Sequence, residues 1–325
     1  MEGKKSCDVP IVKQGSSTSS YDDMVREIYL LPAVEFYKHR LPDLALLKTI
    51  LEDLRATRRS HLALDFTRYG PIKSKRRICL SHEEVGSIFG TVLRSGCEVA
   101  HIYVNETGFL GAALSKGNCS YEQLFEFSGR LQSVNITDLV SHDAPDWGLV
   151  SMASAATGLG GFSIRELGWC ACPEIPATGG CQQALTITNP LLLSQANHAL
   201  RWVSLSGVAL HPSIFIAVLR SWMPTLTELS LCCVYIQARG NEWLEIFRCL
   251  HSSQILESFQ TVGLVDDNRN SRLQDGTLAQ GYVLLHESDG RNGDKLVLNG
   301  RQDVQEGLLL NIERGMHETF FYDDE

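Results

Sequence analysis

The chain repeats a short pattern in which apolar residues fill the first, fourth and sixth of six consecutive positions. Clear copies begin at Val25, Val99, Leu131, Leu159, Leu200 and Leu226, and weaker copies stand at positions 61–64 and 256–259. Apolar residues at alternate positions predict a β strand with one buried face. The pattern alone is weak, because a chain that is 44% hydrophobic fills three fixed positions by chance in about one window in twelve.

The residues that follow several copies have the spacing of an amphipathic helix. Ser81-His-Glu-Glu84 has the form of a capping box, and Pro212 stands where it can open a helix. Apolar residues then recur on one helical face, as at Leu44, Leu47, Leu51 and Leu54, at Ile88, Phe89 and Val92, at Phe215, Val218, Leu219 and Trp222, and at Trp243, Ile246, Phe247 and Leu250. The sequence therefore predicts units that each contain a strand and a covering helix.

A strand and a helix that recur every few tens of residues are typical of solenoids, in which stacked neighbours complete the core. We predict an α/β fold: a leucine-rich-repeat-like solenoid of alternating strands and helices, with a parallel sheet on its concave side. This solenoid is expected to span residues 21–265. Residues 1–20 are small, charged and polar, and are predicted to be a disordered tail.

Beyond residue 265 the pattern changes and predicts a C-terminal cap over residues 266–325. Tyr282–His286 and Lys295–Leu298 flank a turn-rich loop and predict a β hairpin. Asp303–Arg314 is predicted to form the last helix, and Tyr322–Glu325 makes an acidic end. A polar cap fits a solenoid, because the terminal repeat needs an atypical outer face.

Composition narrows the classes of partner. The formal net charge of -9 argues against a general nucleic-acid binder, because affinity for phosphate rests on Lys and Arg. No run of about eighteen apolar residues predicts a membrane span, and the polar beginning lacks the apolar core of a signal peptide. We expect a cytoplasmic or nuclear protein that contacts neither nucleic acid nor membrane. Its ten scattered cysteines predict free thiols.

Three segments carry a family resemblance. Residues 200–208 read Leu-Arg-Trp-Val-Ser-Leu-Ser-Gly-Val, residues 223–231 read Met-Pro-Thr-Leu-Thr-Glu-Leu-Ser-Leu, and residues 243–247 read Trp-Leu-Glu-Ile-Phe. In these phrases and in the order of its elements, the chain from 21 to 314 resembles the divergent leucine-rich-repeat region of F-box-type proteins from filamentous fungi. The resemblance implies a receptor whose repeats hold a substrate protein while an N-terminal F-box docks a ubiquitin-ligase adaptor.

The segment nearest to an F-box is Leu41–Leu54. It begins with Leu-Pro, as an F-box does, but it lacks the Glu expected shortly afterwards, and its Ile-Leu pair lies one residue late. We therefore interpret it as the helix of the first repeat and predict a non-enzymatic scaffold that binds another protein. The alternative is a complete F-box-type substrate receptor of a ubiquitin ligase, which requires residues 41–62 to form an exposed helical hairpin for the adaptor.

A second alternative is a metal or thiol enzyme. Cys170, Cys172 and Cys181, with His198 further along, are side chains of the kind that bind zinc. Their spacing matches no common zinc knuckle, so we interpret them as unpaired loop thiols. The sequence contains no serine-hydrolase, metalloprotease or nucleotide-loop motif. We therefore assign no catalytic residue, no cofactor and no metal ligand.

Candidate binding residues follow from strand geometry. Side chains alternate along a strand, so the residues between the buried apolar positions point to the concave side. Aromatic residues there matter most, because exposed aromatic side chains often anchor protein interfaces. The candidate partner-binding residues are Tyr29, His101, Tyr103, Asn135, Arg165, Trp202 and Glu228.

Overall fold

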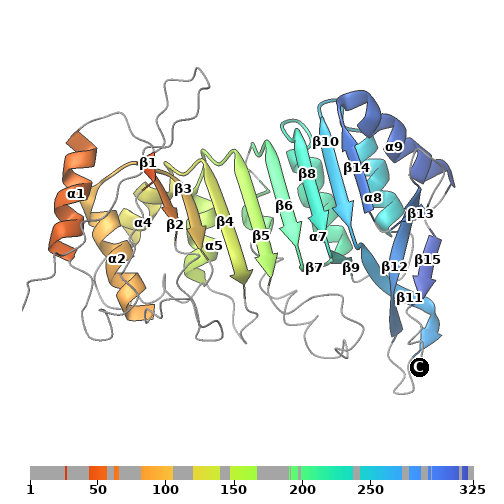
Figure 1. Ribbon diagram of the computed structural model, residues 1–325, viewed down its shortest axis with the longest axis horizontal. Helices are drawn as coiled ribbons and strands as arrows, with labels where there is room; N and C mark the ends of the chain where they lie inside the picture. The colour runs from red at the N-terminus through yellow and green to blue at the C-terminus, as the bar shows by residue number, and fades with distance from the viewer. Residues whose placement is uncertain are drawn as a thin grey trace, which may run out of the picture. The chain divides into compact units, whose positions relative to one another are not determined.

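The computed structural model contains two compact units, Met1–Asn135 and Ile136–Glu325 (Figure 1). It describes residues 26–27, 44–56, 62–65, 82–104, 120–139, 147–166, 190, 192–196, 199–236, 242–272, 278–286, 292–293, 295–314 and 317–320. Each unit combines β strands with α helices, in agreement with the predicted mixed α/β class.

The first unit consists of parallel strands joined by helices. Its elements are β1 (Arg26–Glu27), α1 (Leu44–Ala56), β2 (Leu62–Asp65), α2 (His82–Ser95), β3 (Val99–Val104) and α4 (Tyr121–Ser128), followed by the start of β4 (Ser133–Leu139). β1 pairs with β2 and β2 with β3, both in parallel, and β4 takes the next place in the sheet. Strands and helices thus alternate along this unit as the sequence predicts.

Apolar side chains from the helices pack into the core of the first unit together with those of the strands. Leu47 and Leu51, one turn apart on α1, are buried. Phe89 of α2 and Phe127 of α4 meet edge to face, with ring centroids 5.3 Å apart. This geometry adds a favourable quadrupole interaction to the burial of both rings. The helical spacing of the apolar residues is therefore what attaches each helix to its neighbour.

The second unit contains a ladder of mostly parallel strands. β5 (Gly161–Glu166), β6 (Trp202–Ser206), β8 (Glu228–Cys232) and β10 (Ser258–Val262) pair in this order, all in parallel. β14 (Lys295–Asn299) pairs with β10 in the antiparallel direction and ends the ladder. The rest of β4 and the helix α5 (Trp147–Ala155) precede β5 in the chain. Successive copies of the sequence pattern therefore become neighbouring strands.

Two rows of buried side chains cross the parallel strands of this ladder. Phe162, Val203, Leu229 and Phe259 make one row, and Ile164, Leu205, Leu231 and Thr261 make the other, all at most 2% exposed. A leucine just before each strand is also buried, namely Leu159, Leu200, Leu226 and Leu256. These are the three apolar positions of the sequence pattern. Apart from Thr261, which is polar, each such side chain stabilises the fold by about 1.5–3 kcal/mol before the loss of conformational entropy.

Each of the strands β6, β8 and β10 is followed directly by a residue with left-handed backbone. These residues are Gly207, Cys233 and Gly263, with φ of 62°, 50° and 62°. The N–H of Gly207 donates to the carbonyl of Cys232 over 2.8 Å, and the N–H of Cys233 donates to the carbonyl of Val262 over 2.7 Å. The chain then enters β7 (Ala209–Leu210), β9 (Tyr235–Ile236) and β11 (Val265–Arg272), which pair in parallel as a second sheet. The same turn therefore recurs after three successive strands of the ladder.

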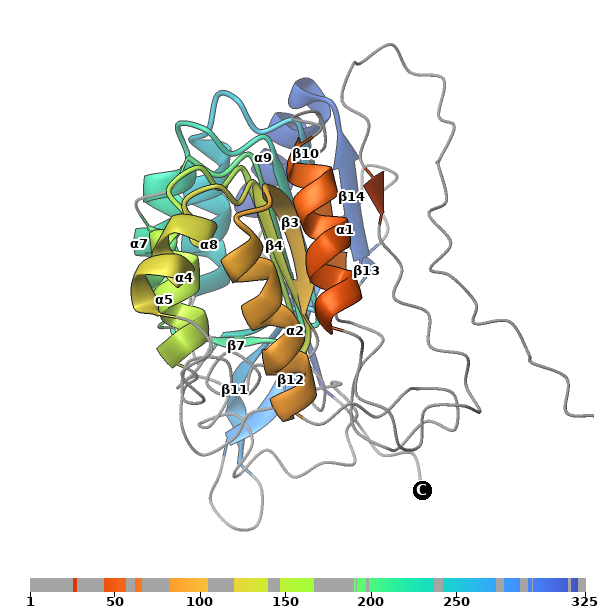
Figure 2. The ribbon, with the colours of Figure 1, turned by 90° about the vertical axis from the view of Figure 1, so that its left-hand side faces the viewer.

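Helices cover the face of the ladder that carries the buried rows. α7 (Pro212–Trp222) and α8 (Glu242–His251) lie on one side of β10 and β14 (Figure 2). Phe247 of α8 meets Phe259 of β10 edge to face, with centroids 5.6 Å apart. Trp222 of α7 is fully buried, and its Nε1 donates to the carbonyl of Gln195 over 2.9 Å. Of the helices that the structure describes, none has the length and apolar character needed to cross a membrane.

The C-terminal segment differs from the predicted hairpin. β12 (Leu278–His286) pairs with β11, β13 (Asn292–Gly293) and β15 (His317–Phe320) in the second sheet, whereas Lys295–Leu298 lies in β14 of the ladder. The two predicted partners therefore belong to different sheets. The physical reason is that Leu296, which pairs with Thr261, is buried and continues an inner row of the ladder. The predicted last helix is present as α9 (Arg301–Arg314).

The left-handed turns predict opposite effects of two substitutions. Gly207→Ala should lower the free energy of unfolding by about 1 kcal/mol, because a side chain is strained in the left-handed region. Cys233→Gly should raise it by a smaller amount, because relief of strain is partly offset by the greater freedom of glycine in the unfolded chain. Urea unfolding of both variants measures the two changes. Changes of equal sign would contradict a strained backbone at Cys233.

The inner row predicts a stabilising substitution at Thr261. Its side chain is fully buried, and its Oγ1 has no hydrogen-bond partner among the residues that the structure describes. Thr261→Val removes this unpaired hydroxyl at nearly constant volume and should raise the free energy of unfolding by about 1 kcal/mol. The reciprocal control, Val262→Thr on the partly exposed side of the same strand, should change it by less than about 0.5 kcal/mol. Urea unfolding measures both changes in the free energy of unfolding. A Thr261→Val variant that is less stable than the wild type would show that the buried hydroxyl is not a cost to the fold.

Candidate functional site

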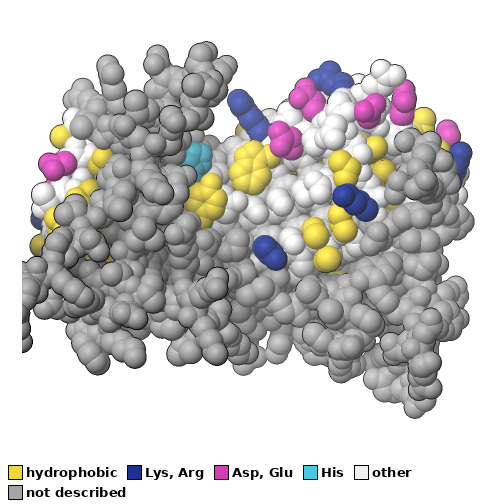
Figure 3. Space-filling view, in the orientation of Figure 1, with side chains coloured by type: hydrophobic (Ala, Val, Ile, Leu, Met, Phe, Trp, Pro, Cys, Tyr) yellow, Lys and Arg dark blue, Asp and Glu magenta, His cyan; other side chains and the backbone are white. Residues whose placement is uncertain are grey.

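The second unit has a sheet face that its own helices do not cover. Because side chains alternate, the residues between the buried ones in β6, β8 and β10 are partly or fully exposed. We call this surface the open face, and it consists of Gly161, Ser163, Arg165, Trp202, Ser204, Ser206, Glu228, Ser230, Cys232, Ser258, Gln260, Val262, Lys295, Val297 and Asn299. Figure 3 shows this face as white polar side chains and backbone, with yellow hydrophobic groups and separated charged side chains among them.

The strand register arranges the open face in three rows. The first row is Gly161, Trp202, Glu228, Ser258 and Asn299; the middle row is Ser163, Ser204, Ser230, Gln260 and Val297; the third is Arg165, Ser206, Cys232, Val262 and Lys295. Serine fills three neighbouring positions of the middle row, so the centre of the face has a low, polar floor. The tryptophan and the charged side chains stand in the two outer rows, and Gln260 and Val297 continue the middle row beyond the serines.

Trp202 dominates the first row because its neighbour in β5 has no side chain. A Cβ atom placed on Gly161 would lie 2.0 Å from Cε2 and 2.2 Å from Nε1 of the indole. Such distances are impossible for real atoms, so the indole occupies the space that any other residue at position 161 would fill. The ring therefore lies directly against the backbone of β5 while remaining partly exposed. It forms a supported aromatic surface.

The charges of the open face are separated along the strands. Glu228, which pairs with Trp202 in the register, is exposed and is the acidic residue of the first row. Arg165 and Lys295, also exposed, stand in the third row at its two ends. Rows one and three are about 13 Å apart, since they are separated by four residues of extended chain. The face thus has an acidic aromatic side and a basic side.

The first unit presents a smaller set of the predicted residues. His101 Nδ1 and Ser133 Oγ share a hydrogen bond of 2.7 Å between β3 and β4. Ser133 is buried, although its position in the pattern predicts an outward side chain. Tyr103 is 36% exposed and Asn135 is partly exposed. This group therefore combines one fixed polar pair with an exposed aromatic ring.

The structure brings some of the predicted residues together and leaves others apart. Trp202 and Glu228 are neighbours, whereas Arg165 lies two rows away on the same face. His101, Tyr103 and Asn135 belong to the first unit, and Tyr29 lies outside the described residues. Their role in binding stays a prediction.

Sequence reasoning missed two contributors to the open face. Gly161 is not among the predicted outward residues, although it takes the same place in its copy of the pattern as Trp202 takes in the next copy. The sequence predicts Lys295–Leu298 as a hairpin strand, whereas this segment pairs with β10 and so adds Lys295, Val297 and Asn299 to the open face. The contributions of Gly161 and of β14 to the open face both depend on strand pairing, and local sequence patterns do not determine which strands pair.

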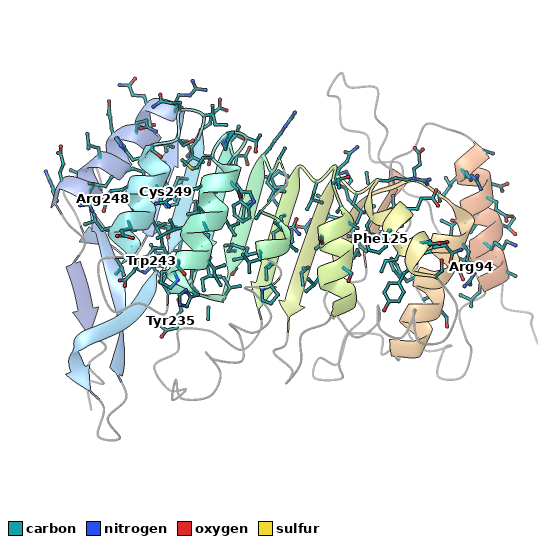
Figure 4. The ribbon with its side chains drawn as sticks, turned by 180° about the vertical axis from the view of Figure 1, so that it is seen from behind. Arg94, Phe125, Tyr235, Trp243, Arg248 and Cys249 are labelled. Carbon is teal, nitrogen blue, oxygen red and sulfur yellow. The ribbon has the colours of Figure 1, made fainter. Side chains whose placement is uncertain are left out.

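Thiols elsewhere in the chain give little support to nucleophilic chemistry. Burial raises the pKa of the Cys97 thiol, and burial likewise raises the pKa of Cys249, which lies on α8 (Figure 4). A raised pKa keeps a thiol protonated and a poor nucleophile near neutral pH. Among the described residues no three His, Cys, Asp or Glu side chains gather as metal ligands would. Cys170, Cys172, Cys181 and His198 lie outside the described ranges.

Comparisons with known proteins add a structural likeness. No known family matches the sequence, and no curated protein matches it either. Among solved structures, the leucine-rich repeat-containing protein LegL7 from Legionella pneumophila is similar over 73% of this chain and 72% of that chain. The two share 13% sequence identity, with a TM-score of 0.29. The repeated strand and turn described above are therefore established by the strand register, the buried rows and the backbone turns of this chain alone.

Proposed function

We propose that this chain is a non-enzymatic, leucine-rich-repeat-like scaffold that binds another protein through its open face. The observation that carries the proposal is the in-register arrangement of that face: a low serine floor, with Trp202 on one side and basic residues on the other. A broad, flat face suits a protein partner better than a small molecule, because small ligands need concave sites that enclose most of their surface.

The recurring unit supports the same proposal. A buried leucine, a strand, a left-handed turn and a strand of the second sheet follow one another three times in the second unit. Solenoid repeats of this kind contact mainly their neighbours and expose an extended sheet surface, which such proteins use for binding. An exposed sheet face with an aromatic anchor is therefore the part of the molecule to which we assign the function.

The finer assignments remain hypotheses within this proposal. Similarity to the substrate-holding part of a fungal F-box protein would make the partner a protein destined for ubiquitin transfer. Leu41 and Pro42, on which adaptor docking would depend, lie outside the described residues. The absence of enzymatic activity and the location in cytoplasm or nucleus also stay predictions.

Blocking the floor of the open face should prevent partner binding. Ser204→Arg places a long side chain in the middle row, where the native serine is partly exposed, and should leave the fold intact. Ala217→Arg is the matched control, because it adds the same side chain at an exposed position of α7 on the helical side. The measurement is affinity capture with the wild-type chain and both variants, followed by quantitative mass spectrometry.

We expect a set of proteins to be captured by the wild type and by Ala217→Arg, and to fall at least about tenfold with Ser204→Arg, since a steric block at an interface centre removes most of its affinity. Thermal unfolding confirms that both variants are folded. Captured proteins that resist Ser204→Arg but disappear with Ala217→Arg would place binding on the helical side and refute the proposal.

A further inference from the structure

We propose that Trp202 and Glu228 form a recognition site for a basic side chain, arginine above all, of the partner protein. This inference rests on the proposed function and adds the chemistry of the contact. The two residues are direct neighbours in the register of β6 and β8, so their side chains leave the sheet about 5 Å apart. An aromatic surface beside a carboxylate is complementary to a planar cation.

Trp202 supplies the aromatic half of the site in a fixed position. Its indole lies in the space left by the missing side chain of Gly161, and its solvent side remains partly exposed. Trp222 shows the contrasting case, since it is fully buried and its Nε1 donates to a backbone carbonyl. The Nε1 of Trp202 has no such partner among the described residues. Trp202 therefore offers a ring that is supported from below and still accessible from above.

Glu228 supplies the anionic half. Its side chain is exposed and forms no ion pair or hydrogen bond with any other residue of the described ranges. The nearby Glu257 differs, because its carboxylate lies 3.5 Å from the guanidinium of Arg301. The carboxylate at 228 is thus the unmatched negative charge of the first row. A basic group that stacks on the indole can reach it without displacing an internal partner.

The rest of the face favours the same orientation of the partner. Arg165 and Lys295 stand in the third row, so a basic partner side chain is repelled there. The net charge of -9 also favours a basic partner at long range. Arginine fits better than lysine, because its planar guanidinium can stack on an indole and donate to a carboxylate at once.

A random dodecapeptide phage library selected on the full chain tests the inference without knowledge of the natural partner. We expect enriched peptides to share an Arg or Lys. Their affinity, measured with synthetic peptides, should fall at least about tenfold with Trp202→Ala and with Glu228→Gln, because each removes one half of a two-part contact. It should stay within about twofold with Glu257→Gln, which removes the same charge outside the site.

Two further variants separate a specific site from a general charge effect. Gly161→Ala should weaken binding although it alters neither recognition side chain, because its Cβ displaces the indole. Glu228→Lys should reverse the selection and enrich peptides with Asp or Glu. Citrulline in place of the shared arginine should weaken binding to the wild type as strongly as Glu228→Gln does.

The outcomes distinguish this inference from the proposed function. Peptides that lose binding with Ser204→Arg but lack a basic residue and ignore Glu228→Gln would overturn the inference and leave the open face as the binding surface. Failure to select any peptide that depends on Ser204 would overturn both. Loss of binding with Glu228→Gln and Glu257→Gln alike would reduce the contact to unspecific charge and would also overturn the inference.

Discussion

The in-register pairing of β5, β6, β8 and β10 is the constraint on which the second unit depends. It places Phe162, Val203, Leu229 and Phe259 in one buried row and a second apolar row beside it. A slip by one residue in any strand would turn its apolar side chains outward and its serines inward. The burial of these rows therefore also determines which residues lie on the open face, because each exposed residue stands next to a buried one in its strand.

The turns after the strands explain why the helices lie on one side. Gly207, Cys233 and Gly263 adopt left-handed backbone at corresponding positions and lead the chain into the second sheet. From there α7 and α8 return over the buried rows. Cysteine at the middle position shows that the register, rather than the residue type, imposes this conformation. The strain at Cys233 is small beside the burial that accompanies it.

Local pattern predicted the strands and several helices well, because burial on one face leaves a period in the sequence. The partner of β14 was predicted wrongly for the same reason: Lys295–Asn299 alternates as any half-buried strand does, and alternation does not identify the partner strand. At the candidate site, Trp202 and Glu228 could be predicted as outward residues. The packing of the Trp202 indole against Gly161 could not be predicted, because it requires two segments about forty residues apart to pair in one particular register.

The exposed tryptophan is not required by the fold. Ser163, Ser204 and Ser230 show that small polar side chains satisfy positions on the open face of three adjacent strands. A tryptophan among them exposes apolar surface to water, and it also depends on a glycine in the neighbouring strand, which weakens that strand. Glu228 beside it adds an exposed charge that stabilises no described contact. A partly exposed tryptophan that costs stability, next to a carboxylate without a described partner, is better explained by a ligand that uses both side chains than by the packing of the sheet.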